Sequence, residues 1–377
     1  MVNRERIVSE FMTQAAISSP SLKEAKMASY LLQRFTDLGA EVVFDDAGSR
    51  VGGEVGNLVA RFAGSKPGQP FLFSVHMDTV VPCADVEPVL DGGTIRSAGD
   101  TVLGADDKAG IAEVVEAIEV VREQGIEHVP LEVVVSIGEE IGLVGAKHLD
   151  LELVEARRGI ALDTPGVDWM VRQAPGANRF RVEVTGRAAH AGVEPENGLS
   201  AIQVAGLALS KMKVGRIDFE TTANVGTVEG GLATNIVAEK VTLNGEARSH
   251  DPQKLADQTE HMLACFEQAA DELTVEIDGK TVRADIKTEV RPDFPSMKVA
   301  EDSGIVTLLQ QAAANLGREM RDRLGGGGSD ANVFNGKGIE MVIIGTGMRN
   351  VHSTEEAVDA DDLVKVAGFL VELIRLA

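Results

Sequence analysis

Residues 71–110 constrain the fold of this 377-residue chain more than any other stretch. They open with an apolar run, residues 71–75, which is too short for a helix and predicts a buried strand. A helical pattern follows from about residue 107 to 123, and the Val-rich run at 131–137 predicts a second strand, covered on both faces. A strand, a helix and a strand in this order indicate a parallel βαβ unit.

The segments on either side of this unit predict an α/β domain with a mixed, mostly parallel sheet between helices. Ser21 is followed three residues later by Glu24, which predicts a capping box at the start of one helix. Helical and apolar strand patterns alternate along these segments, the helices at 3–16, 21–38, 299–316 and 361–376, and the strands at 41–44, 57–62, 159–162 and 341–345.

The chain is too long for one ordinary core, so we expect two domains. The pattern changes after about residue 173, where residues 179–185 alternate as in a half-exposed strand and residues 273–286 predict a hairpin. Such strands are typical of an antiparallel sheet in an α+β unit. We therefore predict an inserted domain at 174–290, within a domain formed by 1–173 and 291–377.

The composition excludes several classes of partner. A formal net charge of −23 argues against nucleic acid and anionic membranes. No run approaches the ~18 consecutive apolar residues of a membrane helix, and the first residues lack the pattern of a signal peptide. Cys83 and Cys265 are far apart, which favours free thiols in a reducing compartment. We expect a cytoplasmic protein.

Acidic and imidazole side chains recur where the predicted strands end. His76 and Asp78 follow the first strand of the βαβ unit, and Glu139 and Glu140 follow its second strand. In open α/β sheets the ligand site lies outside the carboxyl ends of the strands, so we expect these side chains to share one site. Three further candidates are Asp106 at the helix start, Asp163 after residues 159–162, and His352 after residues 341–345.

These groups would repel one another if they were packed together without a cation. Mixed nitrogen and oxygen ligands favour zinc, with cobalt or manganese as alternatives. Two ions about 3.5–4 Å apart need a shared carboxylate and two further ligands each. The count fits Asp106 as the bridge, His76 with Asp163 on one ion, and Glu140 with His352 on the other. Asp78 could then fix the tautomer of His76, and Glu139 could accept a proton from water.

Each pattern alone also has a simpler explanation. A histidine two residues before an aspartate is usually a polar strand end, and a pair of glutamates is usually solvated surface. Asp107 and Lys108 could form an ordinary first helical turn. The repetition of acidic groups at successive strand ends favours a metal hydrolase over these alternatives.

The whole chain resembles the peptidase T-like branch of the cocatalytic-zinc aminoacylase/carboxypeptidase superfamily of metallopeptidases. Each matching motif is modest alone, but all of them in one order over the full length are specific. The motifs are SVHMDTV at 74–80, LGADDKAGI at 103–111, GEEIG at 138–142, AHAG at 189–192, GG at 230–231 with TNIV at 234–237, ARSHD at 247–251 and VHS at 351–353.

The resemblance implies a zinc-binding domain interrupted by a smaller lid domain, with a possible homodimer through the lid. It implies the same metal roles, with Glu139 as general base, and a cis peptide bond between Asp106 and Asp107. His190 matches a histidine that stabilises the oxyanion, and Asn235 and Arg248 match groups that hold the substrate's backbone and carboxylate. Residues 325–330 correspond loosely to a glycine-rich loop on the substrate side.

We therefore predict a dinuclear zinc hydrolase that cleaves amide bonds of small peptides, as an aminopeptidase or tripeptidase does. The chain is shorter than authentic peptidase T, and no complete set of residues that would clamp a tripeptide's amino terminus is evident. An N-acyl- or N-carbamoyl-amino-acid amidohydrolase therefore remains an alternative. A non-catalytic binding relative is a weaker alternative, because all five predicted ligands, Asp78 and Glu139 are present.

Overall fold

The computed structural model describes residues 1–377 and divides them into two compact units. Residues 1–174 and 297–377 form one unit, which we call the sheet unit, and residues 175–296 form the other, the inserted unit. The sequence places the insertion at 174–290, and residue 290 lies inside a strand that runs from Asp285 to Phe294. No helix has the length and apolar character required to cross a bilayer.

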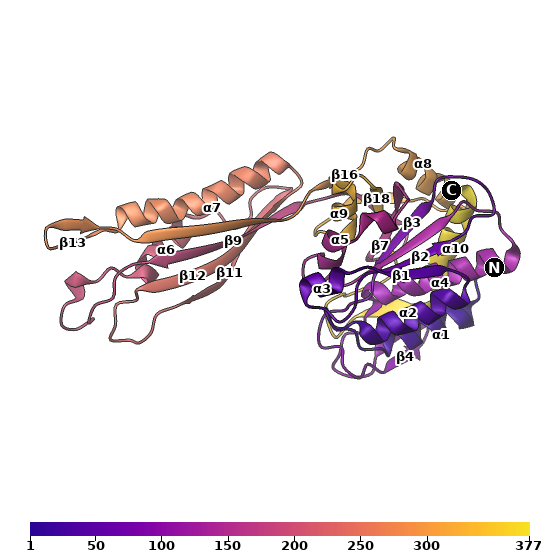
Figure 1. The fold of residues 1–377 in the computed structure, drawn as a ribbon, viewed down its shortest axis with the longest axis horizontal. Helices are drawn as coiled ribbons and strands as arrows, with labels where there is room; N and C mark the ends of the chain where they lie inside the picture. The colour runs from indigo at the N-terminus through magenta and orange to yellow at the C-terminus, as the bar shows by residue number, and fades with distance from the viewer. The chain divides into compact units, whose positions relative to one another are not determined.

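The sheet unit contains a nine-stranded sheet (Figure 1). Its path runs β1-β2-β6-β3-β7-β18-β8-β16, and β17 pairs with β8. The central strands β6, β3, β7 and β18 are parallel to one another, which confirms the predicted α/β class. The strands are β1 (Glu41–Phe44), β2 (Leu58–Phe62), β3 (Phe71–His76), β6 (Leu131–Ser136), β7 (Arg158–Thr164), β8 (Trp169–Ala174), β16 (Met297–Lys298), β17 (Arg321–Leu324) and β18 (Glu340–Gly345).

Helix α4 (Ala105–Gln124) is the predicted crossover between β3 and β6. It is buried along most of its length because it packs on β3 and β7 on one side and on two further helices, α1 (Arg4–Ala15) and α10 (Ala360–Leu376), on the other. The apolar run that reads as a strand, β3, is buried at all six positions. The βαβ unit thus forms the centre of the sheet, and it brings the carboxyl ends of β3 and β6 to one edge.

The remaining elements of the sheet unit are short or peripheral. They are α2 (Ala25–Asp37), α3 (Ala47–Val51), α5 (Val144–His148), α8 (Gly304–Asn315), α9 (Asp330–Gly336), the 3-10 turn η1 (Leu151–Leu153) and a small sheet of β4 (Pro88–Asp91), β5 (Thr94–Ser97) and β19 (Ala357–Asp359).

The predicted capping box is wrong. Helix α2 begins at Ala25, and Glu24, which is at its N-cap position, makes no side-chain cap hydrogen bond. The Ser21 hydroxyl instead donates to the Asp78 carboxylate at 2.6 Å, and Glu24 accepts the backbone N–H of Gly138 at 3.0 Å. Long-range contacts therefore take both side chains that the local pattern assigns to the helix.

The inserted unit is a five-stranded antiparallel sheet with two helices packed on one face (Figure 1). Phe180, Val182 and Val184 of β9 face the helices, as their alternation predicts. The strand order is β10 (Gly215–Arg216), β11 (Thr221–Gly230), β12 (Lys240–Ser249), β9 (Gly176–Thr185) and β15 (Asp285–Phe294). The two helices are α6 (Ala201–Lys211) and α7 (Pro252–Glu272), and a 3-10 turn, η2, covers Pro195–Asn197. The predicted hairpin is formed by β13 (Val275–Ile277) and β14 (Lys280–Val282).

Strand β15 is a long element of the inserted unit that the sequence does not predict. Most of its residues are exposed, so it lacks the alternation that marks β9. It nevertheless pairs with β9 over almost its whole length, from Asp285 opposite Thr185 to Phe294 opposite Ala177.

Candidate metal centre

The five predicted ligands lie at the carboxyl edge of the central strands, where the sequence places them. His76 is the last residue of β3, Glu140 lies just after β6, Asp163 is near the end of β7, and His352 follows β18. Asp106 lies in the first turn of α4, at a non-helical position, and its peptide bond to Asp107 is cis.

Asp106 lies between the two histidines. Its Oδ1 is 3.0 Å from His76 Nε2, and its Oδ2 is 3.3 Å from His352 Nε2. One carboxylate therefore offers a separate oxygen to each imidazole, which is the arrangement that a bridging ligand requires. Ligand atoms of His76, Asp106 and Glu140 all lie within 4.8 Å of one another, which is compact enough for a metal site.

The remaining two proposed ligands, Glu140 and Asp163, each lie near one of the two histidines. Glu140 lies 3.0 Å from His352 Nε2, and Asp163 Oδ1 lies 4.0 Å from His76 Nε2. The structure thus brings together His76 with Asp163 and Glu140 with His352, the two pairs proposed from the sequence, on opposite sides of Asp106.

The protonation of the cluster reflects its crowded charges. Burial and the nearby Asp106 carboxylate raise the pKa of Asp163 to about 8. Hydrogen bonds to Asp106 and Glu140 raise the pKa of His352 to about 10. Burial opposes ionisation of Asp106, but its hydrogen bonds to both histidines lower its pKa. Without a cation, protons held by Asp163 and His352 offset part of the crowded negative charge. A set of two imidazoles and three carboxylates fits a divalent cation, which would replace those protons.

Glu139 lies beside the ligands in the wall of the same cavity and is only 9% exposed. Burial and the neighbouring Asp163 raise its pKa well above the usual value. A carboxylate beside a metal site that is more basic than an ordinary glutamate is suited to accept a proton, which is what a general base requires.

Asp78 is fully buried and contacts His76 differently from the sequence-based expectation. The backbone carbonyl of Asp78 lies 3.0 Å from His76 Nδ1, whereas its carboxylate lies 3.5 Å away. The carboxylate accepts the backbone N–H groups of Glu139 at 2.9 Å and Glu140 at 3.2 Å. Asp78 is therefore placed to fix the histidine tautomer through its carbonyl and the glutamate loop through its side chain.

Several side chains outside the set of proposed ligands support this edge. Glu356 accepts the backbone N–H groups of Gly104 at 2.7 Å and Asp106 at 2.9 Å, so it holds the start of α4. Asp107 accepts the backbone N–H of His76 at 3.2 Å, and Asp330 accepts a hydrogen bond from the Ser136 hydroxyl. The proximity of Glu356 to His352 in the sequence is the only local signal that could have indicated its role.

The cluster opens into a cavity of about 470 Å³ that belongs wholly to the sheet unit. The four carboxylates of Asp106, Glu139, Glu140 and Asp163 line it together with His352. The glycine-rich loop at 325–328 lines another wall, as the sequence suggests for a substrate-side loop. Apolar side chains complete the cavity: Val171, Leu324, Ile343, Met348 and Val351.

The predicted substrate residues His190, Asn235 and Arg248 all lie in the inserted unit. The backbone N–H of Ala191, which follows His190, donates to the carbonyl of Asn235 at 3.0 Å, so these two residues lie in adjacent segments. The guanidinium of Arg248 donates two hydrogen bonds to Glu246, at 3.0 and 3.1 Å.

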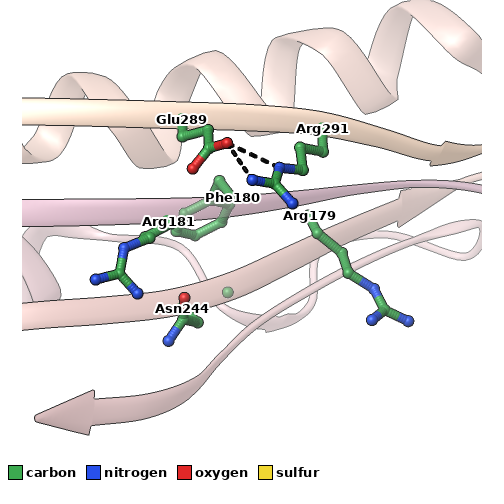
Figure 2. A pocket seen from close by; sticks show the side chains of 7 residues that line it. Arg179, Phe180, Arg181, Asn244, Glu289 and Arg291 are labelled. Atoms are coloured by element: carbon green, nitrogen blue, oxygen red, sulfur yellow. Dashed lines mark hydrogen bonds and ion pairs between the residues drawn. The ribbon is translucent and has the colours of Figure 1, made fainter. Parts of the chain in front are cut away.

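A second hollow, on the sheet of the inserted unit, carries none of these residues. Figure 2 shows Arg291 paired with Glu289 on β15, and Arg179, Arg181 and Asn244 on the neighbouring strands β9 and β12. This hollow contains no histidine and a single carboxylate, so it lacks the ligands for a metal.

Comparison with known proteins agrees with this geometry. The chain is 42% identical over its whole length, and over the whole of its relative, to the uncharacterized protein YqjE of Bacillus subtilis. A structure of aminopeptidase PepT from Bacillus cereus matches with 41% identity and a TM-score of 0.90, covering 100% of this chain and 99% of that one. A tripeptidase structure from Staphylococcus aureus matches with 37% identity and a TM-score of 0.93, covering 100% and 98%.

The pattern of peptidase family M20/M25/M40 matches residues 72–376, which include every residue of the cluster. This match and the PepT and tripeptidase structures confirm the resemblance to peptidase T-like metallopeptidases that the motifs indicate. The chain therefore belongs to peptidase family M20/M25/M40.

Proposed function

We propose that this peptidase is a two-zinc aminopeptidase that hydrolyses short peptides, with tripeptides as the first candidates. The observation that carries the proposal is the position of Asp106, whose two oxygens lie 3.0 and 3.3 Å from the Nε2 atoms of His76 and His352. The substrate class is supported by the similarity to an aminopeptidase PepT and to a tripeptidase, at 41% and 37% identity.

His76 and Asp163 would hold one ion, Glu140 and His352 the other, and Asp106 both. Two divalent cations bound here would polarise the scissile carbonyl and lower the pKa of a water molecule. The chain's own groups would move the proton. Glu139 would accept it from the water and deliver it to the leaving amine, and Asp78 would keep the glutamate loop in place through its two backbone hydrogen bonds.

The residues expected to contact the substrate from the inserted unit are His190, Asn235 and Arg248. We propose that His190 stabilises negative charge on the carbonyl oxygen during attack. We propose that Asn235 and Arg248 bind the substrate's backbone and its carboxylate. In the free protein the guanidinium of Arg248 pairs with Glu246, so a substrate carboxylate would have to replace that partner.

We further propose a cytoplasmic homodimer that uses the inserted unit. Both cysteines are free, as is usual in a reducing compartment. Large apolar side chains of the inserted unit are exposed, including Leu232 at 88% and Val193 at 67%. Light scattering of the purified protein, compared with a Leu232→Asp variant, tests the dimer; a monomeric wild type would contradict it.

The deciding experiment measures metal content per chain and hydrolysis of a defined substrate panel. The panel contains free tripeptides, free dipeptides, N-acetyl amino acids and N-carbamoyl amino acids, each assayed after loading with zinc, cobalt or manganese. Two ions per chain and turnover of free tripeptides would support the proposal. Turnover restricted to the N-blocked amino acids would replace it with an amidohydrolase, and the absence of tightly bound metal would overturn it.

A further inference from the structure

Arg323 is placed at the cavity by an irregular strand. It lies on β17, and the pairing of β17 with β8 shifts register between Asp322 and Leu324. Such irregularities redirect a side chain away from the regular alternation of a strand. The Nη2 group of Arg323 donates to the Thr164 hydroxyl and, at 2.8 Å, to the Pro165 carbonyl. Thr164 directly follows Asp163, so these bonds anchor the guanidinium next to the metal centre.

The positive charge of Arg323 is not matched by any carboxylate. Its partners are the Thr164 hydroxyl, the Pro165 carbonyl and the ring of Trp169, 5.3 Å from the guanidinium carbon. Two other arginines of the sheet unit are paired with carboxylates: Arg172 with Asp322 at 2.6 Å, and Arg318 with Asp168 at 2.5 Å. Burial lowers the pKa of Arg323 from its usual value, since desolvation is not offset by an acidic neighbour.

Arg323 is also the only lysine or arginine in the wall of the cavity that contains the metal centre. Val171 and Leu324 line the same wall, and their apolar side chains cannot accept a hydrogen bond from the guanidinium. Two of the five guanidinium N–H donors are used by Thr164 and Pro165, so three remain for a ligand. A half-buried cation with free donors in a substrate cavity is a site for an anion.

We infer that Arg323 is a specificity-determining residue that binds a carboxylate of the peptide substrate. This inference rests on the proposed function, because it assigns a recognition group to the same cavity. The carboxylate could be the C-terminus of a short peptide or the side chain of an aspartate or glutamate residue. Arg248 does not duplicate this role in the free protein, because its charge is already matched by Glu246.

The test compares Arg323→Met and Arg323→Lys with the wild type on four substrates. These are a neutral tripeptide, its C-terminal amide, and the same pair with an N-terminal glutamate. Arg321→Met is the matched control, because Arg321 is on the same strand and stacks on the same Trp169 ring at 4.2 Å but does not line the cavity. Binding is also measured by calorimetry in a Glu139→Gln background, which gives dissociation constants without turnover.

We expect Arg323→Met to raise KM for the carboxylate-bearing substrates by about tenfold to a hundredfold, the range for a lost charge-assisted hydrogen bond. kcat should change little, Arg323→Lys should recover part of the loss, and Arg321→Met should behave as the wild type. If the wild type discriminates against the amides and Arg323→Met does not, the ligand is the terminal carboxylate. If only the glutamate peptides lose affinity, the ligand is the acidic side chain.

An equal loss of kcat on all four substrates, with reduced metal content, would assign Arg323 a structural role through Thr164 and overturn the inference. Unchanged KM and dissociation constants for every substrate would overturn it as well. The proposed function fails separately, if the metal-loaded wild type cleaves none of the peptides. In that case, weaker calorimetric binding of the carboxylate peptides to the Arg323→Met protein would still support the inference.

Discussion

The buried carboxylate of Glu24 accepts hydrogen bonds from the backbone N–H of Gly138 at 3.0 Å and of Leu22 at 2.7 Å. Gly138 directly precedes the Glu139–Glu140 pair, so a residue from the N-terminal region fixes the loop that carries the proposed base and one proposed ligand. Asp78 holds the same loop from the other side, through the N–H groups of Glu139 and Glu140.

Replacing Glu24 by Ala should therefore reduce both stability and activity. The buried N–H of Gly138 and the partly buried N–H of Leu22 would lose their acceptor, at about 1–3 kcal/mol for a fully buried donor. Glu24→Gln is the matched control: its amide oxygen can still accept, so its melting temperature and kcat should stay much closer to those of the wild type. Thermal unfolding and steady-state kinetics measure both effects, and equal behaviour of the two variants would show that the hydrogen bonds to the loop are unimportant.

Replacing Glu139 by Gln should lower kcat by about 10²–10⁴-fold, the usual contribution of a general base. The amide keeps the size of the side chain but cannot accept the proton. Metal content, measured by plasma emission spectroscopy, should remain that of the wild type. Retained turnover would remove Glu139 from its proposed role, and lost metal would make it a ligand.

Replacing Asp106 by Asn should weaken binding at both metal positions. Its two oxygens lie next to different histidines, and an amide offers only one ligand oxygen without charge. The fall in zinc affinity should be at least as large as the ~10–100-fold fall that follows removal of a residue that only supports a metal ligand. Titration with zinc gives the affinities, with the exposed Asp91→Asn as control. Two tightly bound ions in the Asp106 variant would contradict a bridging role.

The metal-free protein should lose stability as the pH rises from 6 to 9. Asp163 has its pKa raised to about 8 in the folded state, so the folded protein retains a proton that the unfolded chain has released. The stabilisation from His352, whose pKa is raised to about 10, is complete below about 6.5 and also decreases with rising pH. Metal binding strengthens over the same range, because it requires deprotonated ligands.

The difference in melting temperature between metal-loaded and chelator-treated protein should therefore grow between pH 6 and pH 9. Calorimetry at several pH values measures it. In the metal-free form, Asp163→Asn should show a weaker dependence on pH than the wild type. A difference that stays constant with pH would mean that these groups titrate normally.

Replacing His190 by Ala should lower kcat by about 10²–10³-fold, as the loss of one oxyanion donor does, and leave metal content unchanged. His250→Ala is a suitable control, because that histidine is in the same unit and belongs to none of the proposed roles. If the His190 variant lost metal, the residue would be a ligand; if it kept full activity, it would have no part in the reaction.

The central βαβ unit could be predicted because its signals are local. Strand β3 is short, apolar and buried throughout, and β6 is rich in valine, so both follow from composition and length. Four of the five proposed ligands follow the same logic, since each is placed at a strand end or helix start, and His352 lies in the loop after β18. Parallel pairing then brings those ends together at one edge.

The supporting residues could not be predicted because their partners are distant in the sequence. Glu24 and Gly138 are 114 positions apart, and Glu356 and Asp106 are 250 apart. Ser21 and Glu24 satisfy the local pattern of a capping box, but the fold offers them buried partners instead. Arg323 could not be predicted for a related reason. Its proposed role depends on having no carboxylate as a partner, and only the folded chain shows which side chains lie near it.

The order of the proposed ligands along the chain has a consequence for biosynthesis. Four of them, up to Asp163, are made before the inserted unit, whereas His352 is made after it. Strand β18, which precedes His352, pairs between β7 and β8, so the sheet itself stays unfinished until that point. A chain translated only as far as Asp163 would carry four of the five proposed ligands and one of the two imidazoles, and the complete ligand set can form only after His352 has been made.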